Sequence, residues 1–430
     1  MKYISIISAF ILAPAAWAAD GTWTYSDCVE YARVHNISLL KSRLNEETAR
    51  YNLEEAQAQW QPTLDFTTSH GLTNTPWGTG NKNAYASSYG LNTGWTVWNG
   101  GKRENTIKQN RLLAKIETLN SDAIMRSIET DLLQVYINIL YTREAIGIQE
   151  EAVSLSEAQA ERGRQLMEAG KISKVDYARL CSQLEQDRYD LVNAQGTYDT
   201  RRMELKKLLE LGIDTDITLA GTEWNASDVM AALPEMDESF RLAVATDLEI
   251  RGLEMQQEVA DLDVAIAKAG HMPEISLNAG VGTGYHAPGT AFGTSLKQGW
   301  NESAGITLSL PIFDNSKTKT ATARAKTAQL DAQLDIDQRL TQLAQEVETW
   351  FIDTRAAQAR FKAAESQLES ATLTDELTNE QFALGYVNTV ELMTAHNAYI
   401  EARHNLLQYK YMAMLGHKMI EFYRTATVSL

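Results

Sequence analysis

Hydrophobic positions recur with one spacing over two long stretches of the chain. From Ile336 to Ala371 they advance in alternating steps of four and three residues, and the same phase runs from Ser121 to Ser156 in the first half. Such steps keep apolar side chains on one face of an α-helix, as in the seam of a coiled coil. The pattern predicts two long helices, over 102–167 and 317–382.

Between the helical stretches, polar and apolar residues alternate at every second position. This holds for Thr63 to Gly71 and Tyr89 to Val97, and again for Ile275 to Val281 and Ala304 to Leu310. A period of two is typical of β-strands with one apolar and one polar face. We therefore predict β-hairpins over 62–98 and 273–312, with strands of about 9–11 residues, the length that crosses a bilayer at a tilt.

Matching turns indicate an internal two-fold repeat. The turn WTVWNGGKREN, Trp95 to Asn105, is matched by SLPIFDNSKTK, Ser309 to Lys319, and the helix-end sequences MEAGKISKVDY and FALGYVNTVEL are also 215 residues apart. Each repeat is predicted to contain a helix, a β-hairpin, a long helix and a further helix. The first repeat is predicted over 19–211, with its opening helix from Tyr25 to Trp60 and its last helix over 174–210. A polar linker follows over 212–238. The second repeat is predicted over 239–430, with its last helix over 388–424.

The N-terminal segment predicts where the protein is located in the cell, and the net charge argues against one class of partner. The chain has 430 residues, 7 prolines and a formal charge of -17, so an acidic surface argues against binding to nucleic acid. Lys2, the apolar run from Tyr3 to Ala13 and the small residues Ala16 and Ala18 predict a signal peptide over 1–18. Elsewhere no stretch approaches the ~20 apolar residues of a membrane-spanning helix. We expect an exported protein with no helical membrane anchor.

The sequence contains few residues or motifs that would indicate catalysis or metal binding. The 2 cysteines, Cys28 and Cys181, fall in separate predicted helices and are expected to be free thiols, and the 7 histidines show no metal-ligand spacing. The sequence contains no P-loop, GxSxG or HExxH motif. We therefore predict no metal site, no cofactor and no enzyme activity.

The predicted strands restrict the assembly. Four strands cannot close a membrane barrel, because the smallest have about eight, and an open sheet edge cannot lie in lipid. Several chains must then share one barrel, and three would give twelve strands. The alternative is an exported coiled-coil structural protein or adhesin without a pore, which shares the heptads and the signal peptide but does not explain strands with one polar and one apolar face.

The paired turns and helix-end sequences resemble those of the TolC-like outer-membrane efflux proteins, the outer membrane factors of tripartite efflux and type I secretion systems. The resemblance covers essentially the whole chain after the predicted signal peptide. It implies a mainly α-helical protein with membrane β-structure: a homotrimer with a shared twelve-stranded β-barrel in the outer membrane and long coiled-coil hairpins forming a helical tunnel in the periplasm. It also implies a periplasmic adaptor protein and an inner-membrane pump of the RND, ABC or MFS type, and export without catalysis.

The resemblance also assigns residues to the end of the tunnel. The residues implied to contact the adaptor are Gly170, Lys171, Ile172, Ser173, Gly385, Tyr386, Val387, Asn388 and Thr389. The acids Asp176 and Glu391 are implied to line a constricted entrance, where threefold symmetry turns a carboxylate into a ring that favours cations. The usual tyrosine, arginine and second aspartate of the family's entrance are replaced by Phe382, Val387 and Thr394, so the usual latch cannot form here.

Overall fold

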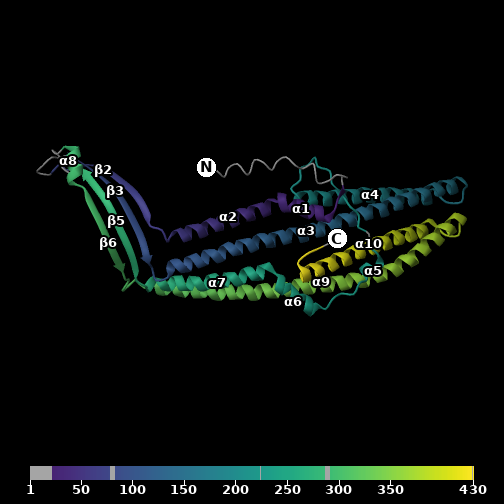
Figure 1. The fold of residues 1–430 in the computed structure, drawn as a ribbon. Coiled ribbons are helices and arrows are strands. Elements are labelled where there is room, and N and C mark those ends of the chain that lie inside the picture. Colours follow the sequence, from purple (N-terminus) through teal and green to yellow (C-terminus); the bar gives the residue numbers. More distant parts are fainter. Residues whose placement is uncertain (1–21, 78–82, 223, 286–290, 429) are drawn as a thin grey trace. The chain divides into compact units, whose positions relative to one another are not determined.

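The computed structural model describes residues 22–77, 83–222, 224–285, 291–428 and 430, which form two compact units (Figure 1). The helical unit consists of the described residues up to Ser42 with Ser121–Leu248 and Arg339–Leu430. The sheet unit consists of Arg43–Asn120 and Glu249–Gln338. The predicted signal peptide, 1–18, lies outside the described residues.

The chain is mainly helical with few strands, as predicted. Among the described residues, no helix combines the length and apolar character needed to cross a membrane. The helices are α1 Tyr25–His35, α2 Ile37–Ala58, α3 Lys102–Glu168, α4 Lys174–Leu208, α5 Ala226–Val229, α6 Met236–Thr246, α7 Leu248–Lys268, α8 Phe292–Gln298, α9 Lys317–Leu384 and α10 Thr389–Thr425, with the 3₁₀ turn η2 Ala269–His271. The strands are β1 Thr22–Trp23, β2 Thr63–Asn74, β3 Asn83–Trp98, β4 Thr218–Leu219, β5 Glu274–Tyr285 and β6 Asn301–Ser309.

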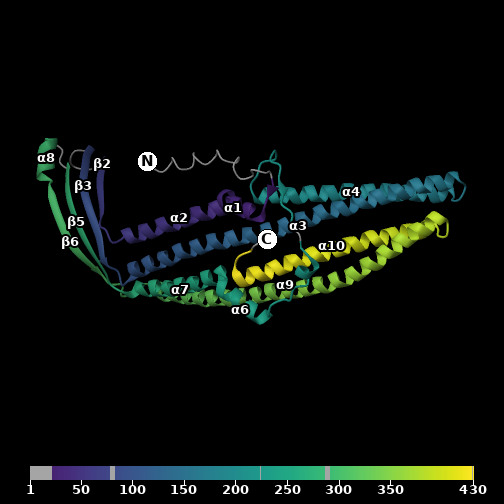
Figure 2. The same ribbon diagram turned by 45° about the vertical axis from the view of Figure 1, so that its right-hand side comes forward.

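The helical unit contains two helical hairpins, one of α3 and α4 and one of α9 and α10. Both hairpins turn at the same end of this unit (Figures 1 and 2). Its core lies away from the turns, where Leu132, Leu140 and Leu205 are fully buried. The phenol of Tyr136 reaches the carbonyl of Ala220 at 2.8 Å, so a buried hydroxyl keeps a hydrogen-bond partner.

Close contact between α9 and α10 depends on one glycine. A Cβ at Gly416 would overlap the side chain of Thr354, which is fully buried and donates its hydroxyl to the Trp350 carbonyl at 2.6 Å. The hydroxyl is therefore held in place by its own helix and cannot easily move aside. Glycine at 416 therefore leaves room for the Thr354 side chain directly against the backbone of α10, so the two helices pack closely at this point.

The first helix differs from its prediction. One continuous helix was expected from Tyr25 to Trp60, but α1 ends before Asn36, whose backbone is extended, and α2 begins after it. The Asn36 side chain accepts the amide protons of Ser38 and Leu39 at 2.9 and 3.2 Å and donates to the Leu208 carbonyl at 3.0 Å. The continuous-helix prediction was wrong because one buried amide caps α2 and replaces the lost helical bonds.

The predicted linker, 212–238, contains regular secondary structure. It contains β4, which pairs in parallel with β1, together with α5 and the start of α6. Gln358 of α9 donates to the carbonyls of Val229 and Ala231 at 3.0 and 2.8 Å. These bonds fasten the linker to the α9–α10 hairpin.

In its described residues, the sheet unit has four antiparallel strands in the order β2-β3-β5-β6. The register pairs Phe66 with Leu91, Leu91 with Val281 and Leu277 with Ile306, so apolar residues of all four strands share one face. The strands have 12, 16, 12 and 9 residues in chain order, so three of them exceed the predicted length. The predicted loop between β5 and β6 also contains a helix, α8.

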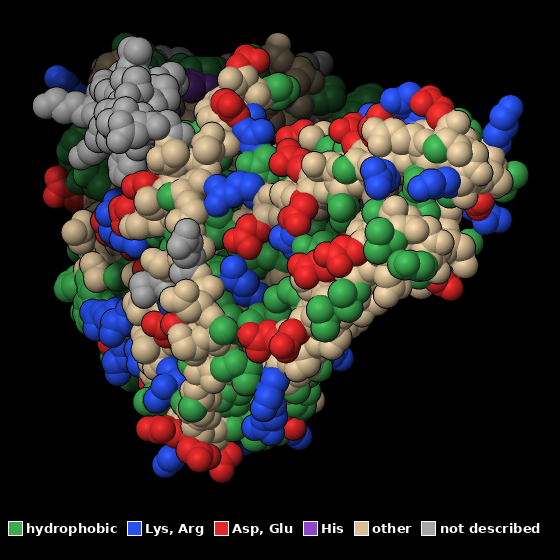
Figure 3. All heavy atoms as spheres, turned by 90° about the vertical axis from the view of Figure 1, so that its right-hand side faces the viewer, with side chains coloured by type: hydrophobic (Ala, Val, Ile, Leu, Met, Phe, Trp, Pro, Cys, Tyr) green, Lys and Arg blue, Asp and Glu red, His purple; other side chains and the backbone are tan. Residues whose placement is uncertain are grey.

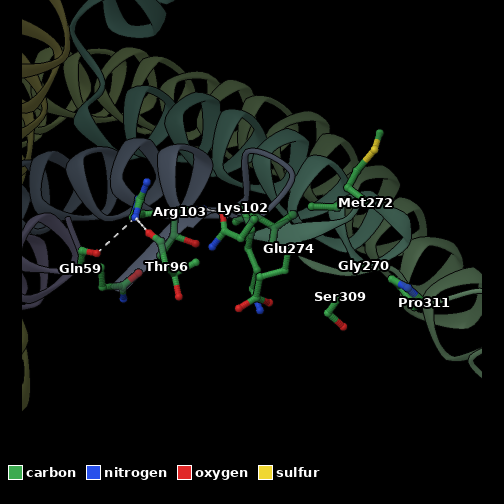
Figure 4. A pocket seen from close by; sticks show the side chains of 13 residues that line it. Gln59, Thr96, Lys102, Arg103, Gly270, Met272, Glu274, Ser309 and Pro311 are labelled. Atoms are coloured by element: carbon green, nitrogen blue, oxygen red, sulfur yellow. Dashed lines mark hydrogen bonds between the residues drawn. The ribbon is translucent and has the colours of Figure 1, made fainter. Parts of the chain in front are cut away.

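The junction between β3 and α3 is organised around a buried arginine. Arg103 donates to the carbonyls of Thr96, Val97 and Gln59, and its guanidinium lies 3.5 Å from the centre of the Trp60 ring. Figure 4 shows Arg103 with Gln59 and Thr96 in a cavity of about 580 Å³. A single side chain thus ties the end of β3 to the chain leaving α2, at the same end of the sheet.

A test of the helix contact is Gly416→Ala. Overpacking of this kind costs about 1–3 kcal/mol, so we expect a lower midpoint of urea unfolding followed by helical circular dichroism. Gly196→Ala is the matched control, because it replaces a helical glycine with no atom within 4 Å of the new Cβ. It should raise the midpoint slightly, since alanine is the better helix former. Equal midpoint shifts in the two variants would contradict the packing explanation.

Candidate functional site

Both helical hairpins turn through a glycine in the left-handed region. Gly170 has φ +71° and Gly385 has φ +81°. After each glycine the next amide reaches back five residues: Lys171 to the Leu166 carbonyl at 2.8 Å, and Tyr386 to the Gln381 carbonyl at 2.9 Å. This is a Schellman motif, which satisfies the last carbonyls of a helix and favours glycine at the left-handed position.

The helices that leave the turns are capped by side chains. The Ser173 hydroxyl accepts the amide of Asp176 at 3.1 Å, and the Asp176 carboxylate accepts the backbone amide of Ser173 at 3.4 Å, which forms a capping box. The Ser173 hydroxyl also donates to the Asp176 carboxylate at 2.7 Å. In the other turn, Asn388 accepts the amides of Val390 and Glu391 at 2.9 and 3.0 Å. Each turn is therefore fixed by a C-terminal glycine and an N-terminal cap within a few residues.

The two predicted entrance acids have different surroundings. Hydrogen bonding by Ser173 lowers the pKa of Asp176, with smaller contributions from Arg179 and Thr389. The Arg179 guanidinium lies 3.5 Å from the Asp176 carboxylate. Glu391 is exposed in the first turn of α10. Asp176 is thus ionised but partly compensated, while Glu391 presents its carboxylate to solvent.

Only two of the three predicted replacements in the latch, Phe382 and Val387, lie together. Phe382 is only 3% exposed and belongs to an apolar cluster with Leu180 and Leu392, against which Val387 also packs. Thr394 is exposed and donates its hydroxyl to the Val390 carbonyl at 2.8 Å. Two of the three positions therefore contribute to the apolar contact between the hairpins, where a hydrogen-bonded latch would need polar groups.

The predicted adaptor contacts divide by exposure. Tyr386 is 79% exposed, whereas Thr389 is buried and Ile172 and Val387 are half-buried against the apolar cluster. The exposed members of the set are Gly170, Lys171, Ser173, Gly385, Tyr386 and Asn388. Figure 3, which faces the hairpin turns, shows both signs of charge interspersed with hydrophobic side chains.

Sequence reasoning missed a buried polar network further along the hairpins. Asp187 of α4 accepts from Gln183 at 2.8 Å and lies 3.3 Å from Nε2 of His396 on α10. A parallel set joins Gln159 of α3 to Asn379 of α9 at 2.9 Å, and Asn379 donates to Asp375 at 3.0 Å. The available signal was a group of polar residues recurring at helical spacing within the predicted apolar hairpins, in both halves of the chain.

The comparisons with known proteins identify the family. The family model described as outer membrane efflux protein matches residues 29–210 and 240–414. The chain is 22% identical over 313 residues to the alkaline protease secretion protein AprF of Pseudomonas aeruginosa, and 24% identical over 170 residues to the outer membrane protein TolC of Vibrio cholerae. These alignments cover 71% and 40% of this chain. They cover 64% and 39% of the two relatives, which is less than two thirds of the length of each relative.

Solved structures show the same fold over nearly the whole chain. A structure of CusC superimposes with a TM-score of 0.82 at 18% identity, covering 94% of this chain and 92% of that one. The outer membrane protein VceC of Vibrio cholerae gives 0.77 at 14% identity, covering 94% and 95%. The chain belongs to the outer membrane efflux protein family, a family of transport channels, and its place is the outer membrane with its helices in the periplasm.

The hairpin turn can be tested by comparing two substitutions at one position. Gly385→Ala forces a Cβ into the left-handed region, which costs about 1–2 kcal/mol, and should raise amide hydrogen exchange in the last turn of α9. Gly385→Asn is the control, because asparagine tolerates this conformation better. A turn whose exchange is equally protected in both variants would contradict the role of positive φ.

Proposed function

We propose that three copies of this chain form a channel that exports molecules from the periplasm, as the exit duct of a tripartite efflux or type I secretion system. Four strands from each copy would build a twelve-stranded barrel in the outer membrane, and the helical hairpins would build a tunnel below it. The two halves would be structural repeats. Supporting this, α3 and α9 begin 215 residues apart, at Lys102 and Lys317, and both hairpins turn through a positive-φ glycine.

The sheet supports the shared barrel most directly. One face carries exposed hydrophobic side chains, including Phe66 at 67% and Leu72 at 83% exposure, with Leu64, Ile306 and Leu308 on the same face. Among the described residues, β2 and β6 each have a strand on one side only. An apolar face suits lipid, but the two open edges do not. Pairing β2 of one copy with β6 of the next removes both edges.

The opposite face suits a water-filled lumen. Ser69 and Ser88 share a hydrogen bond of 2.8 Å, and Asn92 donates to Thr67 at 3.3 Å. Glycines lie opposite polar residues in the register, as in the pair Gly94 and Asn278. In the strands of a membrane β-barrel, small and polar residues that face the lumen alternate with apolar residues that face lipid.

The hairpin turns are the proposed contact for a periplasmic adaptor, which would connect the duct to an inner-membrane pump. AprF is named as a protease secretion protein, so the proposed cargo includes proteins as well as small molecules. The exposed turn residues, Lys171, Ser173, Tyr386 and Asn388, are accessible for such a contact. The buried Thr389 would instead support the turn from within.

The proposed face assignment predicts different results for neighbouring residues. An arginine on the lipid face costs about 2–4 kcal/mol at mid-membrane, while lumen substitutions are tolerated. Phe66→Arg should therefore reduce detergent-stable trimers in the outer membrane. Thr67→Arg, one residue along the same strand, should assemble normally and change single-channel conductance.

The proposed oligomer is tested with the unaltered protein. After purification from membranes in detergent, its mass should be that of a trimer, and planar bilayers should show a small cation-selective conductance. A monomer extracted without detergent that conducts no current would reject the channel. The result would then favour an exported coiled-coil structural protein.

The entrance assignment predicts a graded loss of selectivity. Because Arg179 partly compensates Asp176, Glu391→Ala should reduce cation selectivity more than Asp176→Ala, and the double variant should reduce it most. Glu185→Ala, which removes an exposed acid of α4 outside the turns, is the matched control. The assignment fails if reversal potentials and block by multivalent cations are the same in the double variant and the unaltered channel.

A further inference from the structure

A surface cavity lies at the end of the sheet where α7, β6 and α9 meet (Figure 1). Its volume is about 600 Å³, and all of its lining residues belong to the sheet unit. Two hydrophobic side chains of the connection from β6 to α9 line it, Ile312 at 94% and Phe313 at 83% exposure. Its lining also includes three lysines and a histidine, all exposed: Lys268, Lys319, Lys326 and His271. The cavity thus combines an apolar part with a basic part.

The apolar part of the cavity continues the apolar face of the sheet. Ile306 and Leu308 lie on that face of β6, and both are exposed. Leu310 and Ile312 follow at every second position beyond the strand and are exposed as well. The row of exposed hydrophobic side chains therefore extends past the end of β6 to the start of α9.

An irregularity in the β3–β5 pairing places a tryptophan on the same face of the sheet. The register shifts between Thr96 and Trp98, so that Trp98 pairs with Ile275. Ile275 is two residues from Leu277 and shares its apolar face, because side chains alternate along a strand. Trp98 stands four residues before α3, as Phe313 stands four residues before α9. Both junctions therefore carry an aromatic side chain at the end of the sheet, the position of an aromatic girdle at a membrane interface.

The stability of α9 does not explain the basic part of the cavity. In a chain of net charge -17, the first ten residues of α9, 317–326, contain four Lys or Arg and no Asp or Glu. Cations are unfavourable at a helix N-terminus, where the helix dipole is positive. The first turn of α3 contains an acid, Glu104, at the position where α9 has Lys319. Among the described residues, Lys268, Lys319 and Lys326 form no ion pair. These lysines are therefore available to a negatively charged partner outside the chain.

The one acid in the lining is already engaged. The Asp314 carboxylate accepts the backbone amide of Thr318 at 2.8 Å, at the start of α9. Hydrogen bonding by Thr318 lowers the pKa of Asp314, so its carboxylate is ionised. One carboxylate that caps a helix cannot balance three lysines, and the cavity keeps an excess of positive charge.

We propose that this cavity binds an anionic phospholipid of the periplasmic leaflet, with the phosphate of the headgroup against Lys268, Lys319 and Lys326 and the acyl chains along Ile312 and Phe313. The inference rests on the proposed function, which places the apolar face of the sheet in the outer membrane. Lysine stems lie along apolar surface while their ammonium groups reach the polar headgroups. Basic pockets beside membrane-spanning segments bind anionic headgroups in this way.

Lipid binding to the full-length protein, purified in a non-ionic detergent, tests the proposal. The probes are fluorescent phosphatidylglycerol and phosphatidylcholine with the same acyl chains, of which only the first has a net negative charge. Because each lysine at an anionic surface contributes about fivefold in affinity, phosphatidylglycerol should bind at least about tenfold more tightly. The preference should shrink in salt of about 0.5 M, which screens exposed charges.

Substitutions separate the two parts of the cavity. Lys319→Gln combined with Lys326→Gln should remove most of the preference and leave the binding of phosphatidylcholine unchanged. Lys41→Gln combined with Lys362→Gln is the matched control, because it removes two exposed lysines outside the cavity, and it should keep the preference. Phe313→Gln should weaken both lipids alike, since it removes apolar contact and no charge. Glycerol phosphate, a phosphate ester without acyl chains, should not compete at concentrations at which phosphatidylglycerol does.

Several outcomes would overturn the lipid assignment. These are equal binding of the two lipids by the unaltered protein, a full preference in the Lys319 and Lys326 double variant, and competition by glycerol phosphate as strong as that by phosphatidylglycerol. Loss of trimers in the double variant with an unchanged lipid preference would instead make the surface a contact between copies. A conducting trimer without the preference would reject only the lipid site. A protein that keeps the preference but conducts no current would reject only the proposed channel.

Discussion

The two edges of the four-stranded sheet, which have no partner strand among the described residues, constrain the rest of the molecule. Each edge strand presents a row of N–H and C=O groups that water can satisfy and lipid cannot. The same sheet carries exposed hydrophobic side chains along one face, from Leu64 on β2 to Leu308 on β6. A sheet of this kind is suited neither to a soluble monomer nor to a monomer in lipid. The proposed closure with further copies would satisfy the backbone and the side chains together.

The hairpin ends combine locally capped turns with a contact between the hairpins. The glycine turns and the capping side chains, such as Ser173 and Asn388, satisfy the local backbone of each hairpin by itself. The contact between hairpins rests on the apolar cluster around Phe382 and on the buried network around His396. The caps lie within each hairpin, and these contacts join one hairpin to the other.

Sequence periodicity predicted most of the fold because long helices and alternating strands depend on patterns that repeat many times. The helical character of the segments around Leu132 and Phe361 follows from such a pattern. The break at Asn36 could not be read in this way, because it depends on a bond to the distant Leu208 carbonyl. Likewise α8 is a short helix inside a glycine-rich segment, where periodicity has too few residues to act on.

The candidate site was predictable only where chemistry is local. The turn glycines and their caps are encoded within a few residues, so Gly170, Ser173 and Asp176 could be singled out. The Asp187–His396 contact joins residues 209 apart in sequence, and no local pattern relates them. The packing of Phe382 and Val387 depends on the partner hairpin, so the resemblance that assigned them to an entrance could not show that they contribute to an apolar cluster.

The central claim, a barrel closed by pairing β2 of one copy with β6 of the next, is tested most directly by disulfide cross-linking. One cysteine would replace Leu72 on β2 and a second would be scanned along β6, in a background with Cys28 and Cys181 replaced. Within one chain these strands lie three strand spacings apart, about 14 Å, beyond the ~7 Å limit for a disulfide. The account predicts covalent trimers on a denaturing gel for cysteines at one register of β6. Only uncross-linked chains at every position would contradict it.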